Sequence, residues 1–219
     1  MTFGSVFGRT FSPTFQPSSQ ATAAAGGWWL SGGIAAANCV AAYQAKGAAS
    51  YAVSLTDLSG NSHTITEGET APNWDTSKGW SEGSVLDTGV NGQTQDWTLV
   101  ITYSGVWISA NLIYSSTSNP RFAMFVNSAP QIVYACITDN QRYAQSGIFT
   151  TRTAGLSGKY GYYNGTLVKT DKGGTISAVP TIKIGPSGAS TRYIHAASIY
   201  NRHLTADEHS ALATAMNAL

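Results

Sequence analysis

The chain has 219 residues, with 12 Lys or Arg against 11 Asp or Glu, so only 11% of its residues are charged. An ordinary soluble domain carries about 25%. The deficit is filled by 25 Ser, 25 Thr and 23 Gly, together with 24 aromatic residues. A net charge of +1 cannot gather a phosphate backbone or an anionic lipid surface, so nucleic-acid and membrane partners are excluded.

The first 27 residues are predicted to form an arm, followed by a single domain over residues 28–219. Four of the seven Phe stand in the arm, at Phe3, Phe7, Phe11 and Phe15, and Gly, Ser, Thr and Pro between them make a helix costly. Because an extended backbone cannot bury its own side chains, the four Phe rings must either pack on the same subunit or dock into a neighbouring one. The linker composition of residues 16–27 favours docking.

Short β-rich runs separated by turn residues follow one another from Trp28 onward. They cover residues 41–43, 64–66, 85–88, 97–103, 107–114, 121–127, 131–138, 143–152, 160–164, 166–169, 181–185 and 193–200. In residues 97–103 the odd positions are large and apolar, as in a strand with one face on a core. Asn164-Gly165 supplies the two positive-φ residues of a type I′ hairpin turn. The fold class predicted is all-β, a two-sheet antiparallel jelly-roll sandwich.

One helix is predicted at the end of the chain. Thr205 and Glu208 have the spacing of a capping box, in which each side chain bonds the backbone N–H of the other residue. Leu212, Ala215, Met216 and Leu219 then share one helical face, so the helix should run from about 206 to 217 and lie on the sandwich.

Catalytic and metal-binding motifs are absent from the sequence, so no cofactor, no metal and no enzymatic activity are predicted. The four His lie in no nucleophile signature, and His203 and His209 are interpreted as surface residues. Glu67 and Glu69 are the one same-face acidic pair of the kind that a sandwich glycosidase needs, but residues 66–72 resemble a loop. The turn Asp57–Asn61 offers few carboxylates for calcium and is interpreted as an Asx turn.

The remaining residues of interest are cysteines and tryptophans. Cys39 and Cys136 each stand among apolar neighbours, which favours two buried thiols over a disulfide. Flat aromatic rings can stack on the CH faces of pyranoses, although an inward-facing Trp in an alternating strand is usually core. Trp74 and Trp80 lie in the polar segment 73–83 and are therefore the candidate glycan-binding residues.

The order of these motifs resembles concanavalin A-like, laminin-G-like jelly rolls, in the form found in virion proteins of tailed bacteriophages. The resemblance rests on residues 38–43, 55–61 (LTDLSGN), 72–80, 97–100 and 159–165, and above all on the ending, 181–185 with 197–208 (ASIYNRHLTADE). It covers residues 28–219. The acidic catalytic strand of glucanase members and the acidic calcium loops of many laminin-G-like members have no counterpart here.

This resemblance implies a head-decoration or tail-accessory subunit of a virion, assembled in the host cytoplasm. Its arm, through Phe3, Phe7, Phe11 and Phe15, would bind shell or tail proteins beside identical neighbouring subunits. The sandwich would display a lectin-like surface able to adsorb to a host-surface glycan. The alternatives are a free-standing carbohydrate-binding lectin and, third, a glycoside hydrolase.

Overall fold

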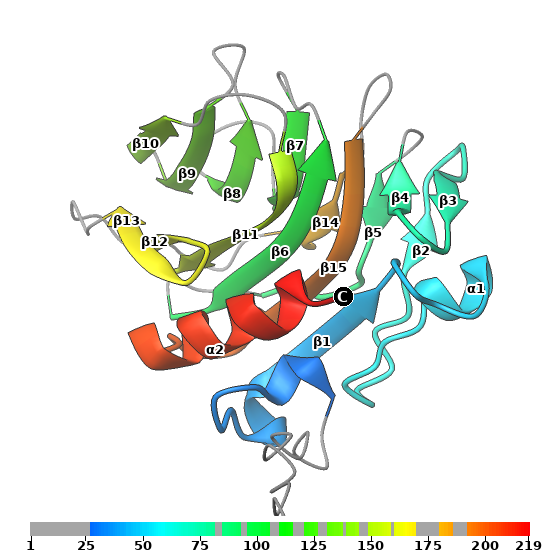
Figure 1. Cartoon of the computed structure of the whole chain (residues 1–219), viewed down its shortest axis with the longest axis horizontal. Helices are drawn as coiled ribbons and strands as arrows, with labels where there is room; N and C mark the ends of the chain where they lie inside the picture. The colour runs from blue at the N-terminus through cyan, green and yellow to red at the C-terminus, as the bar shows by residue number, and fades with distance from the viewer. Residues whose placement is uncertain are drawn as a thin grey trace, which may run out of the picture.

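Two antiparallel β-sheets lie face to face, and one helix covers the outer face of one of them (Figure 1). The computed structural model describes residues 27–81, 85–92, 96–105, 110–115, 121–126, 131–137, 139–144, 149–158, 160–169, 180–185 and 192–219. The prediction of an all-β, two-sheet antiparallel sandwich with a C-terminal helix is confirmed. Residues 1–26, which include the four Phe of the predicted arm, lie outside the described residues.

The first sheet, called sheet A, has the order β13-β12-β11-β6-β15-β4-β3, and β1 also pairs with β15. Its strands are β1 (Cys39–Gln44), β3 (Asn73–Asp75), β4 (Gly79–Ser81), β6 (Thr98–Gly105), β11 (Phe149–Ser157), β12 (Tyr160–Tyr163), β13 (Thr166–Lys169) and β15 (Arg192–Tyr200). The second, sheet B, has the order β10-β9-β8-β7-β14-β5-β2. Its strands are β2 (Thr66–Glu67), β5 (Leu86–Asp87), β7 (Ala110–Tyr114), β8 (Arg121–Val126), β9 (Gln131–Ile137), β10 (Asp139–Ala144) and β14 (Lys183–Ile184).

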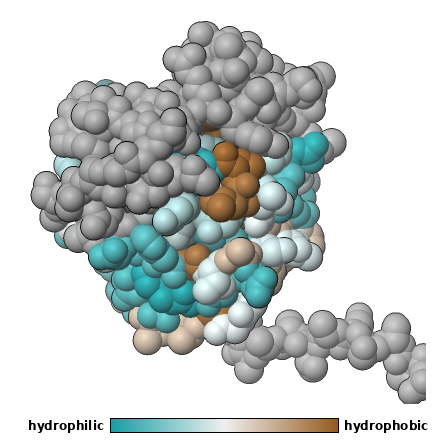
Figure 2. All heavy atoms as spheres, turned by 90° about the vertical axis from the view of Figure 1, so that its left-hand side faces the viewer, coloured by the Kyte–Doolittle hydropathy of each residue, from teal (hydrophilic) through white to brown (hydrophobic). Residues whose placement is uncertain are grey.

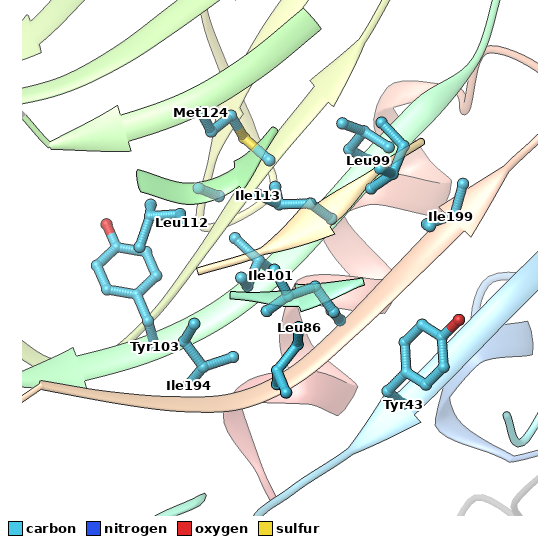
Figure 3. Packing of buried hydrophobic residues seen from close by; sticks show 14 of the residues in the cluster. Tyr43, Leu86, Leu99, Ile101, Tyr103, Leu112, Ile113, Met124, Ile194 and Ile199 are labelled. Carbon is cyan, nitrogen blue, oxygen red and sulfur yellow. The ribbon is translucent and has the colours of Figure 1, made fainter. Parts of the chain in front are cut away.

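The main core lies between the sheets and is built from the alternating positions of their strands (Figure 3). On β6, Leu99, Ile101 and Tyr103 point into it, as the odd-position pattern predicted. From sheet B, Leu112 and Met124 meet them, and all five side chains are buried. Because side chains alternate along a strand, this register leaves the even positions of β6 on the outer face of sheet A.

One predicted strand, residues 143–152, belongs to two different sheets. Its first part is the end of β10, which pairs with β9 in sheet B, and its last part is in β11, which pairs with β6 in sheet A. Both parts are rich in β-forming residues, so the pattern gave no sign of the change of sheet.

The hairpin at Asn164-Gly165 is confirmed. Asn164 has φ 47° and Gly165 has φ 79°, the two left-handed conformations that a type I′ turn requires. The turn joins β12 to β13, an edge strand of sheet A. In Figure 2, which looks at the left-hand side of Figure 1, the described surface shows a small hydrophobic area among polar residues, and Leu167 of β13 is 44% exposed.

The terminal helix, α2 (Ala206–Asn217), has the predicted bounds and the predicted capping box. A second core lies beneath it, on the outer face of sheet A, where Leu212 and Met216 pack against Val100, Ala196 and other buried residues. The helix therefore covers the part of the outer face of sheet A that it crosses in Figure 1.

Three short helices and one hairpin were not predicted. They are the 3-10 turns η1 (Trp28–Leu30) and η2 (Ala36–Asn38), the single turn α1 (Tyr51–Ser54), and the β3–β4 hairpin. Each is shorter than the window in which a hydrophobic period can be recognised. No helix among the described residues has the length and apolar character needed to cross a membrane.

Candidate functional site

The β3–β4 hairpin carries both tryptophans that the sequence singled out. Its turn is closed by the Asp75 carboxylate, which accepts from the backbone N–H and the hydroxyl of Ser77, and these bonds lower the pKa of Asp75. Gly79 follows with φ 97°, and a side chain there would collide with the carbonyl oxygen of Ile194 on β15. Local turn chemistry and one glycine thus place Trp74 and Trp80 opposite each other.

Trp80 is a core residue, so its interpretation as a sugar platform is wrong. Its side chain is completely buried, and its indole N–H donates to the hydroxyl of Ser54 at 2.9 Å. It belongs to the cluster between the two sheets. A ring enclosed in this way offers no face to a ligand.

Trp74 is the one that remains at the surface. Its ring is half-buried at the edge of the sandwich, and its indole N–H donates to the carbonyl oxygen of Ala45 at 2.8 Å. The bond uses the ring's polar atom and fixes its orientation, while part of the ring stays accessible. A fixed, partly exposed indole is what stacking on a sugar ring requires.

Two residues from other elements lie beside Trp74. The Tyr51 ring of α1 is 6.4 Å from the Trp74 ring, centroid to centroid, at an interplanar angle of 49°. Burial first, and then the nearby carboxylate of Glu67 on β2, raise the pKa of Tyr51. The Tyr51 hydroxyl oxygen is itself buried and forms no well-aligned hydrogen bond, and the Glu67 carboxylate is the acceptor near it. We call Tyr51, Glu67 and Trp74 the aromatic rim.

Only one residue of the acidic pair Glu67 and Glu69, singled out in the sequence, takes part in this rim. Glu67 and Glu69 are both exposed, and Gly68 between them is pinned by a backbone bond to the carbonyl of Val85 at 3.2 Å. Glu67 ends strand β2, where a loop was predicted, and it alone acts on Tyr51. The pair supplies the rim with one carboxylate, a strong acceptor for hydroxyl groups.

The turn at Asp57 is confirmed as an Asx turn. One carboxylate oxygen of Asp57 accepts from the backbone N–H groups of Ser59, at 2.9 Å, and Ala42, at 3.0 Å. The other oxygen accepts from the N–H of His63 at 3.1 Å. This carboxylate therefore ties the turn to β1. Among the described residues, no three His, Cys, Asp or Glu side chains gather as metal ligands.

The predictions for the histidines and cysteines are confirmed for some residues and wrong for one. His203 is exposed, as expected, but His209 is 2% exposed, so its placement at the surface is wrong. Its ring stacks on Tyr162 with 3.7 Å between centroids, because α2 packs on the β12–β13 hairpin. Cys39 is confirmed as a buried free thiol, and burial raises its pKa to about 12. The side chain of Cys136 lies outside the described part of the structure.

One polar pair was missed by the sequence analysis. The Ser104 hydroxyl of β6 and Nε2 of His195 on β15 are 2.8 Å apart, although 91 positions separate them in the chain. Burial first, and then the charge of Lys46, lower the pKa of His195 to about 4, so the ring is neutral at pH 7. No local motif marks the pair, because only the β6–β15 pairing brings it together.

No family model matches this sequence, and no curated protein matches it either. Solved structures do share its fold. A Trypanosoma rangeli sialidase in complex with sialic acid superposes with a TM-score of 0.58 at 14% identity, over 81% of this chain and 33% of the sialidase chain. A mutant of that sialidase displaying trans-sialidase activity gives a TM-score of 0.59 at 13% identity, over 84% and 34%. An HCR/D structure, from botulinum toxin, gives 0.56 at 12% identity, over 83% and 52%.

This chain spans only a third to a half of the length of these proteins, and at such identities the likeness establishes the fold alone. It nevertheless corrects two predictions. The prediction of a bacteriophage virion subunit is wrong, because the matching folds belong to sialidases and a toxin domain. The prediction that the chain is not an enzyme is contradicted as well. That prediction relied on the missing acidic catalytic strand, whereas the same fold occurs in sialidases.

Proposed function

We propose that this chain is a glycan-recognition domain of the concanavalin A-like, laminin-G-like kind, which binds a sugar ring at the aromatic rim. The observation that carries the proposal is Trp74, which is half-buried at the margin of the core, with its indole N–H held by Ala45 and the Tyr51 ring beside it. The CH face of a pyranose would stack on the indole, and a sugar hydroxyl would donate to Glu67. The sialidase in complex with sialic acid supports the proposal as a fold neighbour whose ligand is a sugar.

The test is a glycan array followed by calorimetry on the hits, with the wild type and Trp74→Ala. Trp74→Ala should weaken binding at least about tenfold, because removing a central aromatic anchor commonly costs about 2 kcal/mol, and about 1.4 kcal/mol corresponds to a factor of ten. Trp28→Ala is a matched control, since Trp28 is also half-buried and donates its indole N–H, to Gln44 at 2.9 Å. Equal affinities of the wild type and Trp74→Ala would contradict the assignment of the rim.

Hydrolysis of a glycosidic bond is the second candidate, favoured by the sialidase structures and by the exposed carboxylates of Glu67 and Glu69. Most glycosidases use two carboxyl groups that flank the scissile bond. Fluorogenic sialosides and neutral glycosides would reveal the activity, and Glu67→Gln should abolish it. Wild-type protein that releases no fluorophore from any of these substrates would eliminate this candidate.

A further inference from the structure

A second group of polar side chains lies on the outer face of sheet A, beyond the end of α2. In Figure 1 the helix crosses β6 and β15 near their lower ends and leaves their upper ends uncovered. The last turn of α2 reaches Thr153, whose hydroxyl donates to Asn217 at 2.8 Å and bonds Thr102 of β6 at 2.9 Å. Ser104 is two residues farther along β6, on the same face as Thr102 and past the helix.

Three segments far apart in the chain meet at this place. The backbone N–H groups of Ala45 and Lys46, at the end of β1, donate to the carbonyl of His195 at 2.8 and 3.0 Å. The next N–H, of Gly47, donates to the carbonyl of Thr76 in the β3–β4 turn at 2.6 Å. The turn and the end of β1 are thus both fixed against β15.

The side chains that converge there are cationic, aromatic and hydroxylic. The Lys78 ammonium lies 5.5 Å from the centre of the Tyr193 ring, within the range of a cation–π contact. Tyr193 is directly opposite Ser104 in the strand register. Lys46 is close enough for its charge to act on His195. We call Lys46, Lys78, Ser104, Tyr193 and His195 the cationic corner.

His195 marks the corner as more than a solvated patch. Its ring is 3% exposed, Nε2 is bonded to Ser104, and Nδ1 is buried without a hydrogen-bond partner among the described residues. A buried polar atom without a partner is destabilising, because it has lost its bonds to water and gained none in return. Such atoms are typical of sites completed by a bound molecule or water. The Asp75 carboxylate of the β3–β4 turn accepts two bonds from Ser77 and also interacts with the charge of Lys78.

We propose that the cationic corner binds the carboxylate of an acidic sugar. The ammonium groups of Lys46 and Lys78 contact the carboxylate, the Tyr193 ring packs on the sugar's CH face, and the Ser104–His195 pair bonds a hydroxyl. A simple anion would need only the ammonium groups, so the ring and the hydroxyl pair select a carboxylated sugar over acetate. The ligand class rests on the proposed glycan recognition, but the site is separate from the aromatic rim.

The test compares glucuronate with glucose, which lacks the carboxylate, and with acetate, which lacks the sugar ring, by calorimetry and NMR titration on the whole chain. Glucuronate should bind more tightly than either, and added salt should weaken it. Lys78→Gln and Tyr193→Ala should each reduce the affinity about threefold or more, as expected for an exposed charge and one aromatic contact. Lys183→Gln on sheet B makes the same change in net charge away from the corner and should bind glucuronate like the wild type.

Glucuronate that binds no better than glucose, or equally well to Lys78→Gln, would overturn the proposal. Acetate that matches glucuronate would show an unselective anion site and overturn it too. Glu67→Gln separates the two proposals, because Glu67 lies on β2 in sheet B and has no contact with the corner in the described structure, so the variant should weaken binding at the rim and leave glucuronate at the corner unaffected. A neutral glycan that binds while glucuronate does not defeats the corner alone, and the opposite result defeats the rim alone.

Discussion

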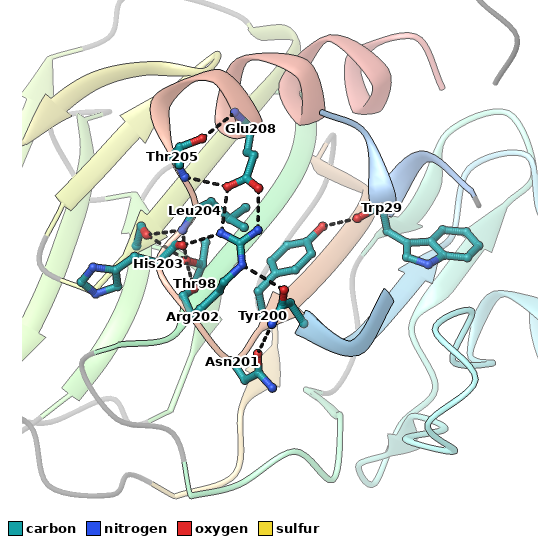
Figure 4. Close-up of polar contacts among 11 residues, drawn as sticks. Trp29, Thr98, Tyr200, Asn201, Arg202, His203, Leu204, Thr205 and Glu208 are labelled. Atoms are coloured by element: carbon teal, nitrogen blue, oxygen red, sulfur yellow. Dashed lines mark hydrogen bonds and ion pairs between the residues drawn. The ribbon is translucent and has the colours of Figure 1, made fainter. Parts of the chain in front are cut away.

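The closing region of the chain, residues 202–208, and the aromatic rim differ in how completely their polar groups are paired. In the closing region the Arg202 guanidinium bonds the Glu208 carboxylate, the side chain of Asn38 and the carbonyl of His203 (Figure 4). The N–H of Leu204 reaches the hydroxyls of Thr98 and Ser157 at 3.2 and 3.1 Å. In the rim, by contrast, the Tyr51 hydroxyl forms no well-aligned bond, even to the nearby Glu67 carboxylate.

This difference separates sequence motifs that indicate structure from residues that indicate a binding site. The motif in residues 197–208 carries most of the resemblance inferred from the sequence, and its polar side chains Arg202, Thr205 and Glu208 bond one another or the backbone. Arg202, by hydrogen bonding, lowers the pKa of Glu208 to about 2. Groups satisfied in this way hold α2 in place and have little capacity left for a ligand.

The largest expected effect is on acid stability. Burial lowers the pKa of His209, on α2, to about 3 and that of His195 to about 4, both below the unfolded value of 6.5. The unfolded chain therefore takes up protons first as pH falls below 6.5, and the free energy of unfolding should drop, by the order of 5 kcal/mol by pH 3. Urea unfolding at several pH values measures the slope, which His209→Gln and His195→Gln should each flatten. An unchanged slope in both variants would contradict this.

The two tryptophans of the hairpin test the comparison within one element. Trp80→Ala should lower the free energy of unfolding by about 4 kcal/mol, since it leaves a cavity and an unpaired Ser54. Trp74→Ala, at a half-buried position, should cost about half as much. Chemical denaturation of both variants measures the difference, and equal losses would mean that the rim is as structural as the core.

Asp57 extends the comparison to the turn that tethers β1. Asp57→Ala leaves the N–H groups of Ala42, Ser59 and His63 without their acceptor and should cost about 2 kcal/mol. Asp87→Ala is the matched control, because this carboxylate accepts from the N–H of Gly89 at an exposed position. A loss no larger than that of the control would show that the Asp57 turn is not a tether.

The smallest effect is expected at the helix cap. Thr205→Ala removes the acceptor for the N–H of Glu208 and should cost about 1 kcal/mol, measured by thermal unfolding. Thr214→Ala in the same helix removes an exposed hydroxyl that bonds the carbonyl of Ser210, so it should have almost no effect. If both variants unfold at the wild-type temperature, the capping box does not help to hold α2.

The sequence predicted features whose cause is local. The Asn164-Gly165 turn, the capping box at Thr205 and the alternation along β6 each depend on residues within a few positions of one another. The error for His209 arose because its burial comes from Tyr162, 47 positions earlier, across the contact between α2 and the β12–β13 hairpin. Trp80 was misjudged for a similar reason, since polar neighbours in sequence concealed a partner, Ser54, on another element.

By itself, then, the sequence determined the fold class, the terminal helix and the absence of a strong charge field, because periodicity, turn chemistry and composition are written in consecutive residues. Only the tertiary structure decided which tryptophan is accessible, that Tyr51 and Glu67 lie beside it, and that Ser104 meets His195. Those contacts depend on strand pairing between distant segments. Pairing is chosen by burial of the whole sandwich, and no single segment encodes it.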